Sequence, residues 1–298
     1  DNIYIFPYRP EETQVSAICN AGIWAGGMTS DGNVKLSGIT YRKSGFDYST
    51  GPLDREGNTN FQVCSNWDKI FTVTGNNIYL HIHNFKNAKI LNQPYDCDKI
   101  PADVKFWPAQ GNPFWMEKYK FPLPDQPLAN YYDYNSDGLY NPCDGDYPLQ
   151  FSHDCQLEYH NQSIRIPDEI NYFIFNDAGS VHSLTNPNYL GMEYHANAYA
   201  YRSDDDLNNM TFYTYKTIYK GTESIKDFYF GLFVHSALGC NMDDFFGYDV
   251  ARSMAYVYNS DDFDGFTNAP CSEFNTYGSQ IPVVGIDFFK GPQVMKAF

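Results

Sequence analysis

Basic side chains are scarce in this 298-residue chain, which holds 20 Lys and Arg residues against 36 Asp and Glu residues. Charged residues make up only 19% of the sequence, and the formal net charge is −16 at pH 7. A negative field repels phosphate backbones and anionic membrane surfaces. We therefore expect no nucleic acid and no anionic membrane among the partners, and cations are the natural counterpart. The alternative is an acidic surface that simply keeps a secreted protein soluble.

Long apolar runs are also missing, so the sequence predicts no transmembrane segment. The chain begins at Asp1, without the basic and apolar stretches of a signal peptide. We therefore expect a processed or experimentally chosen start. The last residues, 291–298, carry no recognisable stop, and we expect them to continue into a longer protein.

Motifs that identify common enzymes are absent. The sequence has no G-x-S-x-G nucleophile elbow, no H-E-x-x-H zinc motif and no glycine-rich phosphate-binding motif. Its cysteines form no C-x-x-C, which removes support for a zinc ribbon or a thioredoxin-like redox site. The sequence therefore assigns no catalytic residue, and we lean towards a protein that is not an enzyme.

Seven cysteines are present, which is an odd number. In an exported protein they would form disulfides and leave one residue over. Closeness in sequence suggests the pairs Cys64–Cys97, Cys143–Cys155 and Cys240–Cys271, with Cys19 unpaired or paired outside this chain. Roughly 105 arrangements are open, so this pairing is a hypothesis. Buried free thiols in a cytosolic protein are the alternative.

Aromatic residues are abundant, since 26 Tyr, 23 Phe and 4 Trp make up 18% of the chain. Such residues favour pleated, half-buried surfaces, and no fifteen-residue window carries a clear helical stripe. Turn signals separate the aromatic and β-branched runs that we predict as strands: 78–82, 172–175, 193–201, 211–219, 228–234 and 255–258. We therefore predict a mainly β fold with β-sandwich-like regions, long ordered loops and little helix.

Proline and asparagine cluster between residues 108 and 150. Each proline removes a backbone donor, so this stretch cannot form a central strand or a long helix. We interpret it as an ordered connector between an N-terminal β region, 1–107, and a C-terminal β-sandwich-like region, 151–298. A connector of this length needs something to hold it in place.

The connector contains an acidic loop, residues 133–144, with the pattern of a calcium-binding loop. Oxygen-bearing side chains fall at loop positions 1, 3, 5, 9 and 12, glycine falls at position 6, and a backbone carbonyl is available at position 7. Calcium takes about six to eight oxygen ligands, and the glycine permits the sharp turn that gathers them. The predicted ligands are Asp133, Asn135, Asp137, the Leu139 carbonyl, Asn141 and Asp144, with Asp146 as a substitute or an addition.

No amphipathic helices flank this loop, and the short Asp144 stands where a chelating Glu is usual, so a calcium sensor of the EF-hand type is disfavoured. The loop resembles those of thrombospondin type 3 and dockerin-like repeats. We expect a structural site that clamps the connector between the two β regions and that extracellular calcium keeps loaded. The alternative is a solvated turn rich in Asp and Asn.

A second acidic group consists of Asp243, Asp244 and Asp249 around Gly247. Three carboxylates within seven residues could bind another cation, form a structural turn or lie on a surface loop. As catalytic acids, two carboxyls would need a defined separation, which the sequence does not reveal.

Two kinds of ring carry weaker signals. His81 and His83 alternate on a predicted strand, so both rings would face one side and suit a transition metal, although a surface or core position is the alternative. Trp24, Trp107 and Trp115 could stack on sugar rings, whereas the usual position of Trp is partly buried in a core.

Several phrases resemble large exported proteins of Bacteroidota that leave the cell through the type IX secretion system. They follow the expected order along nearly the whole chain: 21–27, 40–47, 51–54, 107–109, 133–140, 145–148, 175–177, 207–209, 243–249, 256–259 and 285–292. The chain departs from the family at Tyr248, where relatives tend to have Cys, and it contains no sorting domain. The resemblance implies a secreted or surface-attached protein and supplies no catalytic mechanism.

These observations support one leading hypothesis and two alternatives. The leading one is a secreted, calcium-stabilised surface module in adhesion, filament or scaffold assembly, whose partners are other surface proteins or glycans. The first alternative is a secreted protein that binds or degrades polysaccharides. The second is an accessory subunit of a larger export or gliding complex.

Overall fold

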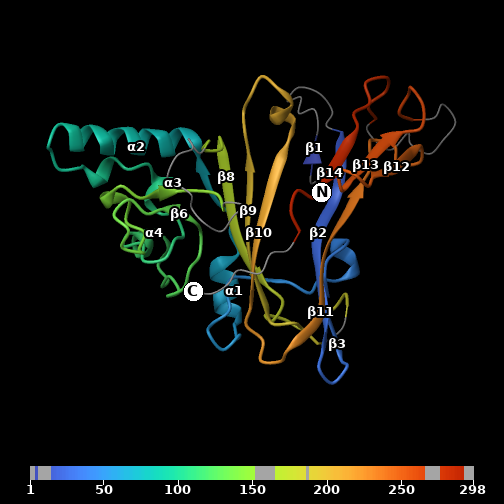
Figure 1. The fold of residues 1–298 in the computed structure, drawn as a ribbon, viewed down its shortest axis with the longest axis horizontal. Coiled ribbons are helices and arrows are strands. Elements are labelled where there is room, and N and C mark those ends of the chain that lie inside the picture. Colours follow the sequence, from blue (N-terminus) through green and yellow to red (C-terminus); the bar gives the residue numbers. More distant parts are fainter. Residues whose placement is uncertain (1–3, 6–14, 152–164, 186–187, 266–275, 292–298) are drawn as a thin grey trace. The chain divides into compact units, whose positions relative to one another are not determined.

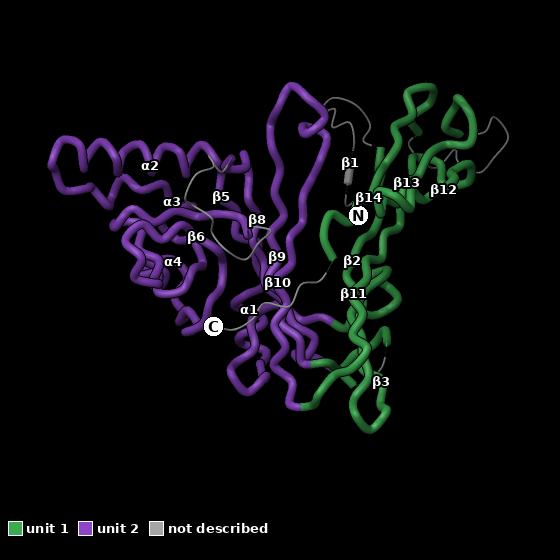
Figure 2. Tube along the Cα trace, viewed as in Figure 1, with its two compact units in different colours: residues 1–47, 181–190, 223–298 green, residues 48–180, 191–222 purple. Residues whose placement is uncertain are grey.

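The computed structural model describes residues 4–5, 15–151, 165–185, 188–265 and 276–291. It confirms the mainly β fold, because 34% of the chain is strand, in four antiparallel sheets, and 18% is helix. Two compact units are present: unit 1 comprises residues 1–47, 181–190 and 223–298, and unit 2 comprises residues 48–180 and 191–222 (Figure 2). The predicted boundaries at residues 107 and 150 both fall inside unit 2.

The largest sheet of unit 1 is organised around its longest strand, β2 (Ser16–Thr29). This strand pairs with β1 (Tyr4–Ile5), β3 (Val34–Gly38) and β11 (Ile225–Ser236) (Figure 1). A second sheet contains β12 (Asp244–Asp249), β13 (Met254–Asn259) and β14 (Val284–Asp287). A small core draws on both sheets and consists of Ala17, Leu238 and Val284.

The five-stranded sheet of unit 2 is centred on β8 (Glu169–Asn176). On one side β8 pairs with β9 (Met192–Ala200), which pairs with β10 (Thr211–Tyr219); on its other side lie β4 (Ser49–Thr50) and β5 (Phe71–Thr74). Alternate β8 residues, Ile170, Tyr172 and Ile174, are buried, as a strand period of two requires.

The buried face of this sheet meets a layer of short helices and loops. The helices are α1 (Phe61–Trp67), α3 (Ala102–Lys105) and α4 (Trp115–Tyr119). Trp67 and Trp115 stack with ring centroids 5.5 Å apart inside this layer. Burial of large apolar side chains, at roughly 2–3 kcal/mol each, provides most of the stability of such a core.

The predicted strand 78–82 is wrong, because these residues lie in helix α2 (Gly75–Ile90). The Thr74 hydroxyl caps this helix by accepting the Asn77 N–H, and the buried Ile78, His81 and Phe85 follow helical spacing. The β-branched and aromatic residues of this segment favour a strand locally. The Thr74 cap and the burial of one helix face stabilise the helix instead.

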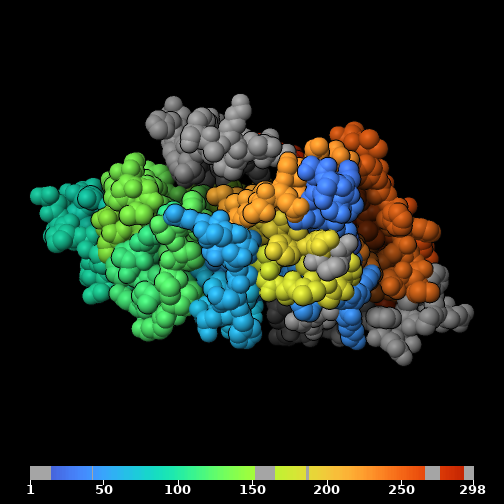
Figure 3. All heavy atoms as spheres, turned by 90° about the horizontal axis from the view of Figure 1, so that it is seen from below, coloured from blue at the N-terminus to red at the C-terminus, as the bar shows by residue number. Residues whose placement is uncertain are grey.

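The other five predicted strands are confirmed, since they lie in β8, β9, β10, β11 and β13. The segment 108–150 contains only short elements, as its prolines predict: α4, β6 (Tyr131–Tyr132), β7 (Tyr147–Pro148) and the 3-10 turn η3 (Pro142–Asp144). In the space-filling view this segment, in green, lies beside α2, in teal (Figure 3). Further 3-10 turns are η1 (Arg42–Ser44), η2 (Cys97–Lys99) and η4 (Asp206–Asn209). Within the described ranges, no helix has the length and apolar character needed to cross a membrane.

Candidate functional site

The acidic loop winds around the carboxylate of Asp133. Its two oxygens accept backbone N–H groups from Ser136 at 2.7 Å, Asp137 at 3.3 Å and Gly138 at 2.8 Å. Ser136 and Gly138 both have positive φ, +62° and +80°, which makes this curvature possible. The side chains of Asn135 and Asp137 contact each other at 2.9 Å, so the first three predicted ligands lie close together.

The Asp146 side chain connects the first and second halves of the loop. Its side chain is fully buried, and its two oxygens accept N–H groups from both ends of the loop, Tyr134 at 2.8 Å and Asn141 at 2.7 Å. Burial raises the pKa of Asp146 to about 6; these two donors oppose the rise, and the negative charges of Asp133 and Asp137 add to it. The structure therefore gives Asp146 a bracing position between the loop ends.

The second half of the loop is held by a separate contact. The Asn141 amide donates to Asp144 at 2.6 Å and its oxygen accepts the Cys143 N–H at 3.2 Å. Leu139, the predicted carbonyl ligand, lies at the exposed tip. All seven predicted positions thus belong to one continuous loop whose two halves meet at Asp146.

Contacts with two helices fix the loop on unit 2. The His81 ring of α2 lies 2.9 Å from the Asp146 carbonyl and 2.8 Å from the Tyr95 hydroxyl. Burial lowers the pKa of His81 to about 4, so the ring is neutral: Nε2–H donates to the carbonyl and Nδ1 accepts from the tyrosine. The buried Tyr140 hydroxyl donates to the Val104 carbonyl of α3 at 2.6 Å.

A disulfide joins Cys97 to Cys143 beside the loop, across 46 residues of sequence. The predicted pairs Cys64–Cys97 and Cys143–Cys155 are therefore wrong, because folding brings together cysteines that are distant in sequence. Cys64 is a free thiol. Cys155 lies outside the described residues.

The donor set of this loop fits a calcium ion. It consists of carboxylate, amide and carbonyl oxygens, which are the ligands that calcium prefers. The sequence contains no Lys or Arg from residue 121 to residue 164. Among the described residues, none forms an ion pair with the carboxylates at 133, 137, 144 and 146. Burial raises the pKa of Tyr131 to about 12, and the negative charges of Asp133, Asp146 and Asp137 add to the rise.

The second predicted acidic group is divided by the fold. Asp244 and Asp249 are the first and last residues of β12, so about 17 Å of extended strand separates them. Asp249 forms an ion pair with Arg252. It therefore lies apart from the other two carboxylates.

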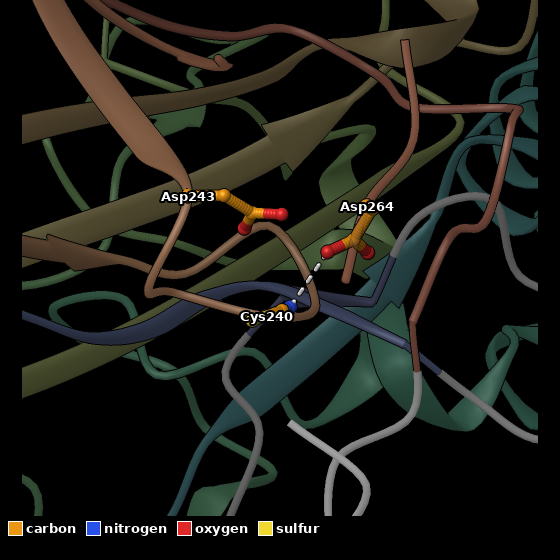
Figure 4. Close-up of side chains that lie close together, drawn as sticks. All are labelled: Cys240, Asp243 and Asp264. Carbon is orange, nitrogen blue, oxygen red and sulfur yellow. Dashed lines mark hydrogen bonds between the residues drawn. The ribbon is translucent and has the colours of Figure 1, made fainter. Parts of the chain in front are cut away.

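A different carboxylate, that of Asp264, lies close to Asp243 in the fold. Each of these residues and Cys240 brings one potential ligand atom within 4.8 Å of the others (Figure 4). Cys240 is in a disulfide, so its sulfur is no thiolate ligand. Its predicted partner, Cys271, lies outside the described residues, and Cys19 is free, as predicted. Sequence spacing missed Asp264 because it follows Asp243 by 21 residues.

The remaining rings have structural positions. His83 is exposed and contacts Asn87, whereas His81 is buried, because residues two apart on a helix point in different directions. The suggested transition-metal pair is therefore wrong. Trp107 and Trp115 are each 1% exposed, and Trp24 donates its indole N–H to the Ile39 carbonyl.

A buried relay that the sequence did not predict crosses unit 2. Tyr172 contacts His195 at 2.8 Å, His195 contacts Glu193 at 2.7 Å, and Glu193 pairs with Lys220 at 2.9 Å. The ionised Glu193 only accepts, so His195 donates from Nε2 and the Tyr172 hydroxyl donates to Nδ1. Tyr172, His195 and Glu193 are all fully buried, and the Lys220 side chain at the end of the relay is 11% exposed.

A cavity of about 410 Å³ opens on the helical layer of unit 2. Its lining combines aromatic rings with two opposite charges: Phe71, Phe106, Trp107, Tyr119, Asp103 and Lys118. The Lys118 ammonium lies 5.3 Å from the Phe106 ring centre and 5.2 Å from that of Tyr119. No family model, curated protein or solved structure matches this chain.

Proposed function

We propose that this chain is a calcium-stabilised module of an exported surface protein, with a role in adhesion, filament or scaffold assembly and without catalysis. The observation that carries the proposal is the buried Asp146 carboxylate. It closes the acidic loop beside Asp133 and Asp137, with no basic partner among the described residues. A calcium ion in the loop would offset the repulsion between these charges.

The surroundings of the loop support an extracellular setting. The Cys97–Cys143 disulfide lies beside it, and disulfides persist chiefly in oxidising compartments. Extracellular modules bind calcium with Kd values of about 10⁻⁴ to 10⁻³ M, which suits a loop without a chelating Glu. The resemblance to exported Bacteroidota proteins points to the same compartment.

In the proposed module, calcium acts as a clamp. The loop contacts α2 through His81 and α3 through Tyr140, so an ion that fixes the loop would also fix these helices on the unit 2 core. Ligand linkage then raises the stability of the folded state by about 2.7 kcal/mol when free calcium is 100 times its Kd. A rigid, protease-resistant surface segment is the expected benefit.

The experiment is thermal unfolding of the purified chain in calcium and in chelator. We compare the unaltered chain with Asp137→Asn, which removes one loop carboxylate, and with Asp204→Asn, which removes an exposed carboxylate elsewhere in unit 2. We expect the Asp204 variant to keep the full calcium-dependent rise in melting temperature and the Asp137 variant to lose most of it. An equal rise in all three proteins would overturn the proposal.

A second candidate function is saccharide binding at the aromatic cavity of unit 2. The half-buried rings of Phe106 and Tyr119 provide apolar faces for a sugar ring, and Asp103 and Lys118 provide hydrogen-bonding groups. A glycan array tests it: binding that Tyr119→Ala abolishes and the exposed control Tyr213→Ala preserves would support it. Retention of the same glycans by Tyr119→Ala would reject this cavity as the binding site.

A further inference from the structure

The turn that follows β11 in unit 1 is built around the side chain of Asp264. Asp264 is fully buried, and its oxygens accept the N–H groups of Cys240 at 2.9 Å and Tyr277 at 2.5 Å. Gly239 has a φ of +69°, and a Cβ there would lie 2.1 Å from an Asp264 carboxylate oxygen. The backbone at Gly239 therefore lies so close to the Asp264 carboxylate that a side chain there would clash with it.

A second carboxylate, Asp243, reaches the same place with an unused oxygen, and Asp244 lies near enough to interact electrostatically with Asp243 and Asp264. Asp243 is 4% exposed; its Oδ2 accepts the Gly265 N–H at 2.9 Å, but its buried Oδ1 has no hydrogen-bond partner. Asp244 accepts the Leu238 N–H at 2.9 Å through Oδ2, and its Oδ1 is likewise buried without a partner. Buried polar atoms almost always have a hydrogen-bond partner, so these two oxygens without a partner indicate a ligand at this position.

An amide oxygen adds to this group. Asn259 lies directly opposite Asp244 in the β12–β13 pairing, and its Oδ1 is also buried without a partner. Its amide nitrogen is used elsewhere, within about 3.2–3.4 Å of acceptors on Asp261 and Phe263. Three orphaned oxygens thus lie at one end of the β12–β13 strand pair.

Asp243, Asp244 and Asp264 have no positively charged partner among the described residues. In that part of the chain, no Lys, Arg or His forms an ion pair with any of the three. Arg252 pairs with Asp249 at the far end of β12. Buried carboxylates are normally paired with a cation or coordinate a metal, because removing them from water is costly.

We propose that Asp243 and Asp264 bind one hard divalent cation, calcium, and that the neighbouring orphaned oxygens of Asp244 and Asn259 turn toward it as further ligands. The carboxylates of Asp243 and Asp264 point toward the space between them, and their nearest ligand atoms lie within 4.8 Å (Figure 4). An ion with calcium–oxygen distances of about 2.3–2.6 Å spans that gap. Because the Cys240 sulfur is in a disulfide, only hard oxygen donors remain, which disfavours zinc.

The ion would tie three segments of unit 1 together: the turn after β11, the start of β12 and the segment after β13. It is independent of the acidic loop of unit 2, so the two proposals can fail separately. Loss of this site would loosen the three-stranded sheet from the end of β11 without altering the loop at Asp133.

The test counts bound calcium by titration calorimetry on the chelator-treated chain of 298 residues. Asp243→Asn should bind one calcium fewer than the unaltered chain, and the matched control Asp249→Asn, at the other end of the same strand, should bind the same number. Asp133→Asn should leave the site at Asp243 intact. Equal calcium counts for the Asp243 and Asp249 variants would overturn the proposal.

Urea unfolding gives a second readout that a purely structural role would not produce. In chelator, Asp243→Asn should be at least as stable as the unaltered chain, because it removes repulsion among buried carboxylates. In calcium the order should reverse. A variant that loses equal stability in both buffers would mean that Asp243 merely supports the turn. If this variant does not fold, Asp244→Asn, which keeps an acceptor for Leu238, provides the same comparison.

Discussion

Replacement of Lys220 by Met tests the buried relay of unit 2. The Lys220 ammonium donates to the Leu53 carbonyl at 2.7 Å, to Gln126 at 2.7 Å and to Glu193 at 2.9 Å. Its removal leaves Glu193 fully buried without the lysine that pairs with it among the described residues, while the hydrogen bonds from Leu53, His195 and Gln126 remain. Breaking a buried pair in this way costs about 3–5 kcal/mol, so we expect a loss of that size.

The assay is urea unfolding followed by tryptophan fluorescence. Three of the four tryptophans, Trp67, Trp107 and Trp115, lie in the unit 2 core and report its unfolding. The exposed Lys86→Met serves as control and should change the free energy of unfolding by less than about 0.5 kcal/mol.

A double-mutant cycle separates the ion pair from other effects. Adding Glu193→Gln to Lys220→Met removes the orphaned charge, so the double variant should lose less stability than the sum of the single variants, by at least about 1 kcal/mol. A loss below about 1 kcal/mol for Lys220→Met alone, or simple additivity, would refute the electrostatic interpretation.

Three further predictions address pH, the disulfide and the core. In the folded protein the pKa of His195 is lowered by burial, despite its bond to Glu193; the pKa of Glu193, which burial alone would raise, is lowered by His195 and Lys220. Groups with depressed pKa values stabilise the fold above their unfolded values, so the part of the free energy of unfolding that these two groups contribute should fall as the pH drops below about 6.5 and again below about 4.3. Asp146, with its raised pKa, contributes in the opposite direction. Urea titrations of the unaltered chain and of Glu193→Gln therefore check the sign by difference, and a stability difference between them that grows on acidification would contradict it. Replacing Cys97 and Cys143 by Ala should cost up to about 4 kcal/mol, from loop-closure entropy over 46 residues; Cys64→Ala, at a free thiol, is the control, and equal losses would refute the assignment. Trp115→Ala should cost about 3–5 kcal/mol, because the ring is 1% exposed and its N–H donates to Phe121, whereas Met116→Ala, 51% exposed, should be nearly neutral in the same measurement.

The three long strands of unit 2, β8, β9 and β10, could be predicted because their own residues favour strands. Aromatic and β-branched residues either alternate along β9 and β10 or are concentrated there. This local preference for a strand agrees with the burial of their side chains in the sheet. β2 was not predicted, because it contains Gly22, Gly26 and Gly27, which lower strand propensity. The structure shows what these glycines permit, which is close packing against neighbouring strands. A Cβ at Gly27, for example, would lie 2.4 Å from the Ile225 side chain of β11.

The candidate sites show the same division between local and distant information. The pattern of the loop from Asp133 to Asp144 could be recognised because its predicted ligands, and Asp146 just after them, are close together in sequence. The contact of His81 with the Asp146 carbonyl and the disulfide at Cys143 depend on distant segments. Asp264 joins Asp243 only through the β11–β12 turn and the β12–β13 pairing, so sequence spacing could not place it.

The central claim is that the loop beginning at Asp133 binds calcium and thereby clamps unit 2. The most direct measurement is a crystal structure of the chain grown in calcium, with anomalous difference density calculated at the calcium signal. The account predicts a peak about 2.3–2.6 Å from oxygens of Asp133, Asn135, Asp137 and the Leu139 carbonyl. A loop whose carboxylates keep only their backbone N–H partners, with no peak among them at saturating calcium, would contradict it.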